Sequence, residues 1–152
     1  ISFNSYSQSW CFDDNKLYFS LKKEYPSLIT TFMGGAFEGS AEILKWHYDR
    51  FERVFPNANQ NYWNPKFSGD NKYKGGLGVN GPKYFGSTTF LVWTTDGYHA
   101  LRTSRNLMFI TTISLHSNQG RKKWYDYAFD IAVHTLVYQA GFHSTYTLLF
   151  KR

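Results

Sequence analysis

The 152-residue chain contains a single cysteine, Cys11, and only four prolines. One cysteine excludes an intrachain disulfide and any zinc site built from several thiolates. Charged residues are also scarce, at 18% of the chain, against about a quarter in typical soluble domains. A chain of this length is expected to form one domain whose core needs no disulfide to hold it together.

The sequence also lacks the motifs of several common chemistries. It has no P-loop, dinucleotide-binding fingerprint, serine nucleophile elbow or zincin motif. The net charge is +6, but the basic residues are scattered, apart from Arg121, Lys122 and Lys123. Because nucleic-acid-binding proteins gather basic residues and aromatics into stripes, we expect no nucleic-acid partner.

Aromatic residues, by contrast, make up 20% of the chain. Tyrosine and tryptophan favour positions with one apolar and one wet side, as at membrane interfaces, protein interfaces and carbohydrate-binding surfaces. Several of them fall in residues 56–86, which also hold three prolines and six glycines. Long connections are usually functional or disordered, and disordered linkers seldom carry so many aromatics. We therefore predict a long ordered loop that packs against the body of the protein.

The first helix is predicted over residues 27–53, after a polar N-terminal segment of residues 1–26. Pro26 marks its start. Gly35 and Gly39 form a small-xxx-small pair on an uncharged stretch of this helix, which lets a second helix backbone approach closely. Such pairs are common between membrane helices, and a tight helix crossing in a soluble core needs the same residues.

Two further helical regions follow the loop. Ser87 is expected to cap one helix or a pair of helices over residues 87–116. The β-branched stretch at residues 106–115 would also fit a strand, but its helical neighbours favour a helix. The last helix is predicted over residues 124–150. The fold class is therefore mostly α, a single-domain bundle of three to four helices.

Residues 124–150 contain no lysine or arginine and have basic residues on both flanks. Basic flanks, interfacial aromatics and a span of about 25 residues are typical of a transmembrane helix. Against this, the span holds Asp126, Asp130 and His134, and the mean hydropathy of the chain is −0.47. Two interpretations remain, a membrane-embedded bundle whose polar residues face inward and a soluble aromatic-rich domain. We favour the first, with lipid and other membrane subunits as partners.

Acidic residues and histidines recur at helical spacing on all three predicted helices. If their faces converge, they form a polar cluster of Glu38, Glu42, Asp96, His99, Arg102, Asp130 and His134. Helical bundles that bind two metal ions place acid and histidine ligands on facing helices in this way. The candidate ligands for a divalent metal such as iron, manganese or zinc are Glu42, Asp96, His99, Asp130 and His134.

Two other interpretations of these residues are open. Asp96 and His99, three positions apart, would equally form a buried hydrogen-bonded pair that fixes a helix. The whole cluster would also serve as a proton relay or polar cavity inside a membrane bundle. His116 precedes a turn and is expected to face solvent.

Three motifs lie in the middle third of the chain, at residues 62–66 (YWNPK), 71–74 (NKYK) and 82–99 (PKYFGSTTFLVWTTDGYH). Together, residues 51–102 resemble a group of small uncharacterised membrane-associated proteins of Bacteroidetes-type bacteria. The chain departs from that pattern at residues 68–70. The resemblance implies a bacterial cell envelope location, and a loop that covers the end of the helix carrying Asp96 and His99.

The leading functional prediction is a small helical membrane protein, an accessory subunit of a larger bacterial membrane complex, with an inward-facing Asp/Glu/His cluster. One alternative is a membrane-embedded metal-dependent enzyme that uses this cluster, with Arg102 binding an anionic substrate group. Another is a soluble periplasmic binding module that uses the aromatic loop. The chain begins at Ile1 and not at methionine, so a removed leader is compatible with each of them.

Overall fold

A computed structural model describes residues 21–117 and 123–151, and these residues are mostly helical. The α-helices are α1 (Leu21–Trp46), α2 (Tyr48–Val54), α3 (Gln60–Trp63), α4 (Gly69–Lys72), α5 (Gly97–Ser117) and α6 (Trp124–His143). Short 3-10 turns are η1 (Lys74–Gly76), η2 (Gly78–Asn80) and η3 (Val92–Thr94), and the π-helical segment η4 covers Ser144–Leu149. The described residues form no strand, only an isolated bridge between Tyr73 and Pro82. The predicted mostly α fold class is confirmed.

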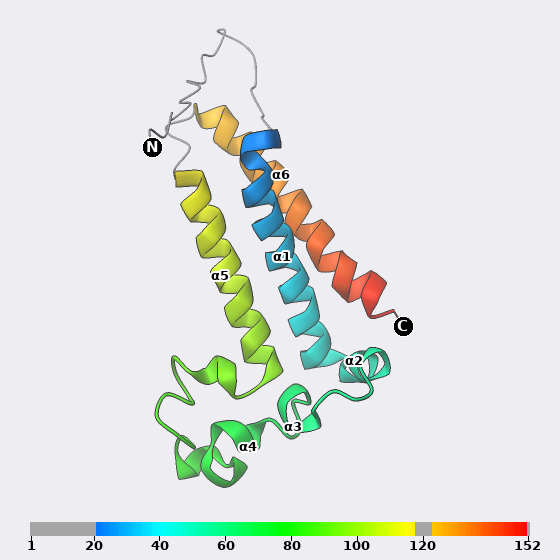
Figure 1. The fold of residues 1–152 in the computed structure, drawn as a ribbon, viewed down its shortest axis with the longest axis vertical. Coiled ribbons are helices and arrows are strands. Elements are labelled where there is room, and N and C mark those ends of the chain that lie inside the picture. The colour runs from blue at the N-terminus through cyan, green and yellow to red at the C-terminus, as the bar shows by residue number, and fades with distance from the viewer. Residues whose placement is uncertain (1–20, 118–122, 152) are drawn as a thin grey trace, which may run out of the picture.

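The three long helices lie side by side, with α1 in the middle (Figure 1). α1 packs against α5 along one side and against α6 along the other, while α5 and α6 make few direct contacts. α5 runs antiparallel to α1, and α6 runs parallel to it (Figure 1). The short helices α2, α3 and α4 gather at the end of the molecule where α1 finishes and α5 begins, called the lower end here.

Glycines bring the backbones of α1 and α6 into contact. A Cβ atom on Gly35 would overlap the carbonyl oxygen of Tyr138, and one on Gly141 would overlap that of Phe32. A Cβ atom on Gly39 would likewise overlap the last turns of the chain. The predicted small-xxx-small pair is therefore the contact face of a close helix crossing, for which only glycine leaves room.

The apolar core is small and lies at the lower end, where α1, α2 and the C-terminal segment meet. Its buried members are Ile43, Leu44, Phe51 and Phe150. The ring of Phe51 stacks on those of Trp63 and Phe150, with centroids 5.3 and 5.9 Å apart. Trp63 belongs to the aromatic loop, so this part of the loop completes the core.

The loop over residues 56–86 is ordered, as predicted, although it also contains the short helices α3 and α4. Several side-chain hydrogen bonds tie it to the segment before α5, two of them from Asn71 and Ser87. Asn71 Nδ2 donates to the carbonyl oxygen of Thr95 at 3.1 Å, and the Ser87 hydroxyl donates to that of Lys72 at 2.9 Å. These bonds hold the loop against the start of α5.

The predicted start of the first helix at residue 27 was wrong, because α1 already includes Pro26. Pro26 is the sixth residue of α1, so the helix lacks one backbone bond, to the carbonyl of residue 22, and continues through the proline. The Ser27 hydroxyl does not cap the helix but donates to the carbonyl oxygen of Glu24 at 2.7 Å, inside α1. The acidic residue Glu24 is therefore part of a helix and not of an irregular segment.

The predicted cap of the second helix was also wrong. Residues 87–96 form turns and η3, and α5 begins only at Gly97. The hydroxyl of Ser87 is used by the loop, as described above, and Asp96 caps α5 by accepting from the backbone N–H of His99 at 2.8 Å. From there α5 is one continuous helix through residues 106–115, which confirms helix over strand for that stretch.

In the two described ranges, no helix is both long and apolar enough to cross a bilayer. The transmembrane span predicted over residues 124–150 is therefore not found. α6 ends at His143, and its first half buries the carboxylates of Asp126 and Asp130.

Replacing Gly35 by alanine should destabilise the protein by about 1–3 kcal/mol, because the added methyl group has no space between the α1 and α6 backbones. Gly69→Ala is the matched control, since a Cβ atom there meets nothing within 4 Å. Urea unfolding followed by circular dichroism measures both. Equal stability of the two variants would show that the helices do not cross this closely.

Candidate functional site

The structure divides the predicted polar cluster among separate places. Asp96 and His99 lie at the start of α5, which is at the lower end, whereas Asp130 lies in the first half of α6, which begins at the upper end, and His134 lies at the middle of α6 (Figure 1). α5 and α6 run in opposite directions, and a helix of this length spans roughly 30 Å. The predicted convergence of Glu42, Asp96, His99, Asp130 and His134 on one metal site is therefore not found.

Glu38, Glu42 and Arg102 lie between these two ends. Glu38 accepts a hydrogen bond from Arg105 Nη1 at 2.5 Å, in a pair that is largely shielded from solvent. Arg102 Nη1 donates to the Tyr98 hydroxyl at 2.7 Å, which holds the pKa of Arg102 above its ordinary value. Glu38 thus belongs to an ion pair between α1 and α5, and Arg102 to a hydrogen bond within α5. Within the described residues, Glu38, Glu42 and Arg102 join no metal-ligand cluster.

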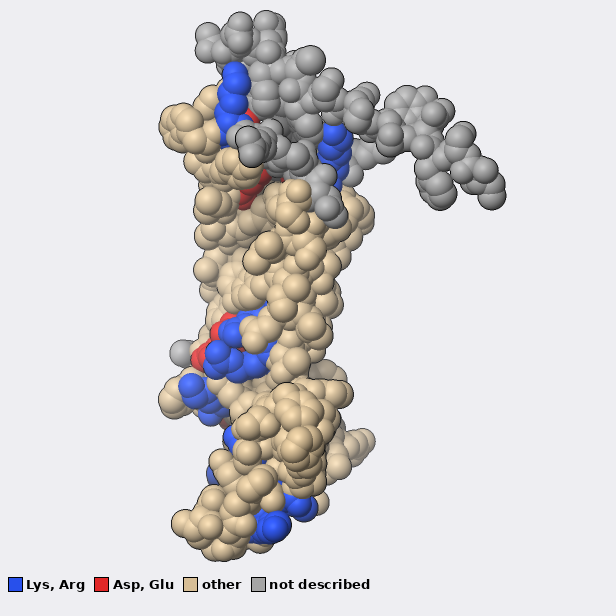
Figure 2. Space-filling view, turned by 90° about the vertical axis from the view of Figure 1, so that its left-hand side faces the viewer, with Lys and Arg blue, Asp and Glu red and all other residues tan. Residues whose placement is uncertain are grey.

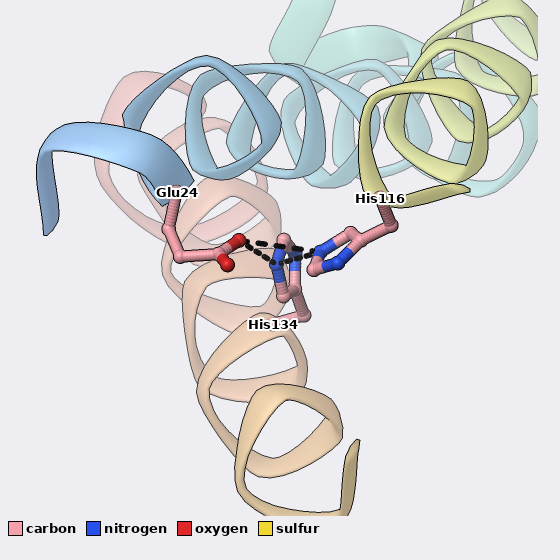
Figure 3. A group of neighbouring side chains, drawn as sticks. All are labelled: Glu24, His116 and His134. Atoms are coloured by element: carbon pink, nitrogen blue, oxygen red, sulfur yellow. Dashed lines mark hydrogen bonds and ion pairs between the residues drawn. The ribbon is translucent and has the colours of Figure 1, made fainter. Parts of the chain in front are cut away.

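Three other side chains meet at the upper end, one from each long helix. Figure 3 shows Glu24 of α1, His116 of α5 and His134 of α6 turned toward one another. The Nε2 atoms of the two histidines are 2.8 Å apart, and Glu24 Oε2 lies 3.5 Å from that of His116 and 4.0 Å from that of His134. These three atoms lie close enough together for one ion to contact them all after small side-chain movements, which would spread the two histidine nitrogens toward the roughly 3.3 Å between ligands of a tetrahedral zinc ion.

The carboxylate of this group is buried. Glu24 is only 1% exposed, and the adjacent hydroxyl residues Ser27 and Thr31 are buried as well. The Ser27 hydroxyl lies 3.1 Å from Glu24 Oε2, within hydrogen-bond distance. A buried carboxylate is expensive without partners, so a positive charge or a donor at this position stabilises the fold.

Hydrogen bonds behind His134 determine which of its ring nitrogens carries the proton. Thr31 Oγ1 lies 2.6 Å from His134 Nδ1 and donates its own hydrogen to the carbonyl oxygen of Ser27 at 2.8 Å. A hydroxyl that donates elsewhere accepts from the ring, so Nδ1 holds the hydrogen. In the neutral ring, Nε2 then presents its lone pair to Glu24 and His116, which is the form that binds a metal.

The same contacts also form a hydrogen-bonded trio without an ion. His116 then donates from Nε2 to the lone pair of His134 at 2.8 Å, with the Glu24 carboxylate nearby. A metal ion would replace that single proton and would contact all three ligand atoms after small side-chain movements. The geometry therefore supports two states of Glu24, His116 and His134. In one, a proton is shared between the two histidines, and in the other a metal ion contacts all three side chains.

A pocket of about 580 Å³ opens beside the two histidines, between α5 and α6. Both His116 and His134 line it, together with the buried carboxylate of Asp130, and Ile113 and Ile131 contribute apolar walls. Glu24 does not line this pocket, so it lies behind the histidines as seen from solvent. A water molecule or substrate would reach the fourth coordination position of an ion bound by this group through the pocket.

At the lower end, Asp96 and His99 pair as their spacing predicted. Asp96 is 6% exposed, and its Oδ2 lies 2.7 Å from His99 Nδ1. Burial raises the pKa of Asp96, but hydrogen bonds from the ring and backbone of His99 and from Thr95 outweigh burial and lower it below its ordinary value. Asp96 therefore carries a charge, caps α5 and orients His99.

Sequence reasoning missed Glu24 and His116. Glu24 was assigned to an irregular segment because Pro26 was interpreted as a helix start, and His116 was expected to face solvent. A signal was available, since Glu24, Ser27 and Thr31 follow one another at helical spacing. That spacing identifies a polar helix face, but it does not identify the neighbour that the face meets.

Asp96→Ala should lower the free energy of unfolding at pH 7 by about 1 kcal/mol, the usual effect of losing an N-cap. The pKa of Asp96 is lower in the folded protein than in the unfolded chain, so its stabilisation is present above the unfolded pKa, near 4, and is lost as the pH falls through the folded pKa. Urea unfolding at pH 7 and below pH 3 should show a deficit that shrinks in acid.

The matched control is Asp49→Ala, because Asp49 forms only an exposed pair with Arg53. Such pairs contribute little, so this variant should match the wild type at both pH values. A deficit of Asp96→Ala that stays constant at acid pH would mean that the carboxylate charge does not carry the effect.

Comparison with known proteins adds no relative. No protein-family model, curated protein or solved structure matches this chain. The function must therefore be inferred from the placement and chemistry of its own side chains, of which Glu24, His116 and His134 are the most distinctive group.

Proposed function

We propose that this protein binds one divalent metal ion, preferably zinc, through Glu24, His116 and His134. The supporting observation is that one carboxylate oxygen and two histidine nitrogens, from three different helices, lie within 4.8 Å of one another around a common centre. The hydrogen bond from His134 Nδ1 to Thr31 supports it further, since metal-binding histidines are oriented through their second nitrogen in this way.

Three protein ligands leave one position of a tetrahedral ion open. Two histidines and one glutamate are the ligands of a class of catalytic zinc sites, in which water or substrate takes the fourth position. Here the pocket between α5 and α6 gives access to that position, and Asp130 supplies a carboxylate in its wall. We therefore propose metal-assisted hydrolysis as the reaction class, with Asp130 as the base that accepts a proton from water.

Protein stripped with a chelator should bind one Zn²⁺ per chain in isothermal titration calorimetry. Glu24→Gln, His116→Ala and His134→Ala should each weaken binding by at least about 100-fold, because each removes a direct ligand. Binding should also weaken at acid pH, because protons compete with the ion for its ligand atoms. Cobalt(II) absorption in the wild type provides an independent measure of the coordination geometry.

His143→Ala is the matched control, since His143 is an exposed histidine of α6 whose ring contacts Thr147 and not the site. Its zinc affinity should equal that of the wild type. A folded protein that takes up no zinc, or an equal loss in His143→Ala, would leave the trio as a hydrogen-bonded structural contact.

Membrane association is a second candidate function with its own observation. In the described helices, Ile113, Ile131 and Leu136 are each at least 67% exposed, whereas Glu24 and Thr31 are almost fully buried. Figure 2 shows, on one face, a stretch without charged residues between charged residues near the upper end and a charged group near the middle of the molecule. Apolar side chains outside and polar ones inside are typical of proteins whose surroundings are apolar. We propose that these sides of α5 and α6 contact lipid, in a protein that acts as an accessory subunit of a membrane complex.

The double variant Ile113→Glu with Ile131→Glu should reduce co-sedimentation with phosphatidylcholine–phosphatidylglycerol vesicles by about tenfold or more, because each charge opposes entry into an apolar phase. Val79→Glu is the control, since Val79 is 92% exposed but lies in the loop at the lower end. It should bind vesicles as the wild type does. Equal binding by all three proteins would contradict lipid contact through α5 and α6.

A further inference from the structure

A second pocket, of about 240 Å³, lies at the lower end of the molecule, between the start of α5 and the loop helices. The pair Asp96 and His99 forms part of its wall, together with small loop residues. The two lysines that line it are Lys45 and Lys72, and the three aromatic residues are Tyr62, Trp63 and Tyr98. It shares no residue with the Glu24–His116–His134 group. What this pocket binds is therefore independent of the proposed metal site.

Asp96 leaves one nitrogen of His99 available to this pocket. An ionised carboxylate only accepts hydrogen bonds, so His99 Nδ1, 2.7 Å from Oδ2, carries a hydrogen. Within residues 21–117 and 123–151, His99 Nε2 has no hydrogen-bond partner, and the side chain is 33% exposed. A ligand in the pocket would thus meet an imidazole whose orientation is already fixed from behind.

The charges around the pocket favour an anion. Lys45 and Lys72 line it, and the acid in its wall, Asp96, is already bonded to His99. Neither lysine forms an ion pair with a described residue, and each ammonium group lies over the ring of the next residue in the chain. Residues 56–95 carry four lysines against one aspartate. An anion would therefore gain two cations without breaking an existing ion pair.

The backbone at the start of α5 does not supply this site. Its first-turn N–H at His99 is already bonded to Asp96 Oδ1 at 2.8 Å, so that donor is not available to a ligand. The donors are side chains instead, from α1, α4 and α5. Tyr62, Trp63 and Tyr98 add aromatic walls against which an organic group can pack.

We propose that this pocket binds the phosphate group of a small phosphomonoester, with Lys45 and Lys72 balancing its charge and His99 Nε2–H donating to one of its oxygens. A phosphate dianion suits the site better than a carboxylate, because it offers oxygens to two ammonium groups and an imidazole at once. With Nδ1 bonded to Asp96, His99 presents Nε2 to the pocket, and a ring that carries hydrogens on both nitrogens donates to Asp96 and to the phosphate at once. The aromatic walls contact the organic part of the ester.

Titration of the zinc-free, ¹³C- and ¹⁵N-labelled full chain with inorganic phosphate and with phenyl phosphate tests this proposal, read from the ring resonances of the histidines. Ionic strength is held constant with sodium chloride. The His99 resonances should shift saturably with both ligands, and phenyl phosphate should bind several-fold more tightly through the aromatic walls. Lys72→Ala and His99→Gln should each weaken phenyl phosphate binding by about tenfold, since each loses a charge-assisted contact.

Two controls make the outcome decisive. Lys74→Ala removes an exposed lysine of the same loop that does not line the pocket, and it should bind within about twofold of the wild type. The His143 resonances should not shift. The proposal is overturned if the His99 resonances do not respond, if Lys74→Ala weakens binding as much as Lys72→Ala, or if only vesicles containing phosphatidic acid shift them. Circular dichroism confirms that the variants fold, and binding of zinc plays no part in the result.

Discussion

The close crossing of α1 and α6 is the constraint on which the upper half of the structure depends. Gly35 and Gly141 leave room for a carbonyl oxygen of the partner helix, so the two backbones touch near the middle of α1. His134 lies seven residues before Gly141, two helical turns away on the same face of α6. The face that makes the crossing therefore also turns His134 toward Thr31 and Glu24.

The crossing has a second consequence for α5. α1 occupies the space between α5 and α6, and the two outer helices make few contacts with each other. At the upper end, His116 and His134 nevertheless reach around α1 and meet at 2.8 Å. The group of Glu24, His116 and His134 thus lies where side chains from all three long helices meet. A change in the crossing would move His134 relative to both of its partners.

The interior between the long helices is unusually polar, and this determines which surroundings suit the protein. The buried apolar core is confined to the lower end, around Phe51 and Phe150. Higher up, buried positions hold Glu24 and Thr31, and both carboxylate oxygens of Asp126 are buried without a hydrogen-bond partner among the residues that the structure describes. Burying such groups opposes folding, whereas the exposed isoleucines and leucines of α5 and α6 gain nothing in water. A cation bound in the interior would offset the cost of burying the carboxylates. An apolar partner on the outside would remove the exposed isoleucines and leucines from water.

Local patterns in the sequence predicted local structure well. The spacing of Asp96 and His99 predicted a pair that the structure contains, because three residues of chain are enough to determine whether those side chains meet. The Gly35 and Gly39 spacing predicted a close helix contact for the same reason. The aromatic content of residues 56–86 predicted an ordered loop, and Trp63 shows why, since its ring completes the core.

Long-range placement was not predictable in the same way. Helical spacing shows which residues share a face, but the direction of each helix decides which ends meet. α5 runs against α1 and α6, so Asp96 lies at the opposite end of the molecule from Asp130. Glu24 was missed because a proline two residues later is tolerated inside α1. His116 was missed because only the arrangement of three helices brings it to His134.

The two proposed sites each contain a histidine oriented through Nδ1, but the neighbouring charge lies on different sides of the two rings. Behind His99 the acceptor is the charged Asp96, so Nε2 faces the lower pocket and its lysines. Behind His134 the acceptor is the neutral Thr31 hydroxyl, and the carboxylate of Glu24 lies on the Nε2 side instead, 4.0 Å from that atom. A cation between Glu24 and His134 would gain from both, whereas an anion in the lower pocket would meet Lys45 and Lys72. The position of the charged neighbours relative to each ring would therefore favour a cation at the upper end and an anion at the lower end.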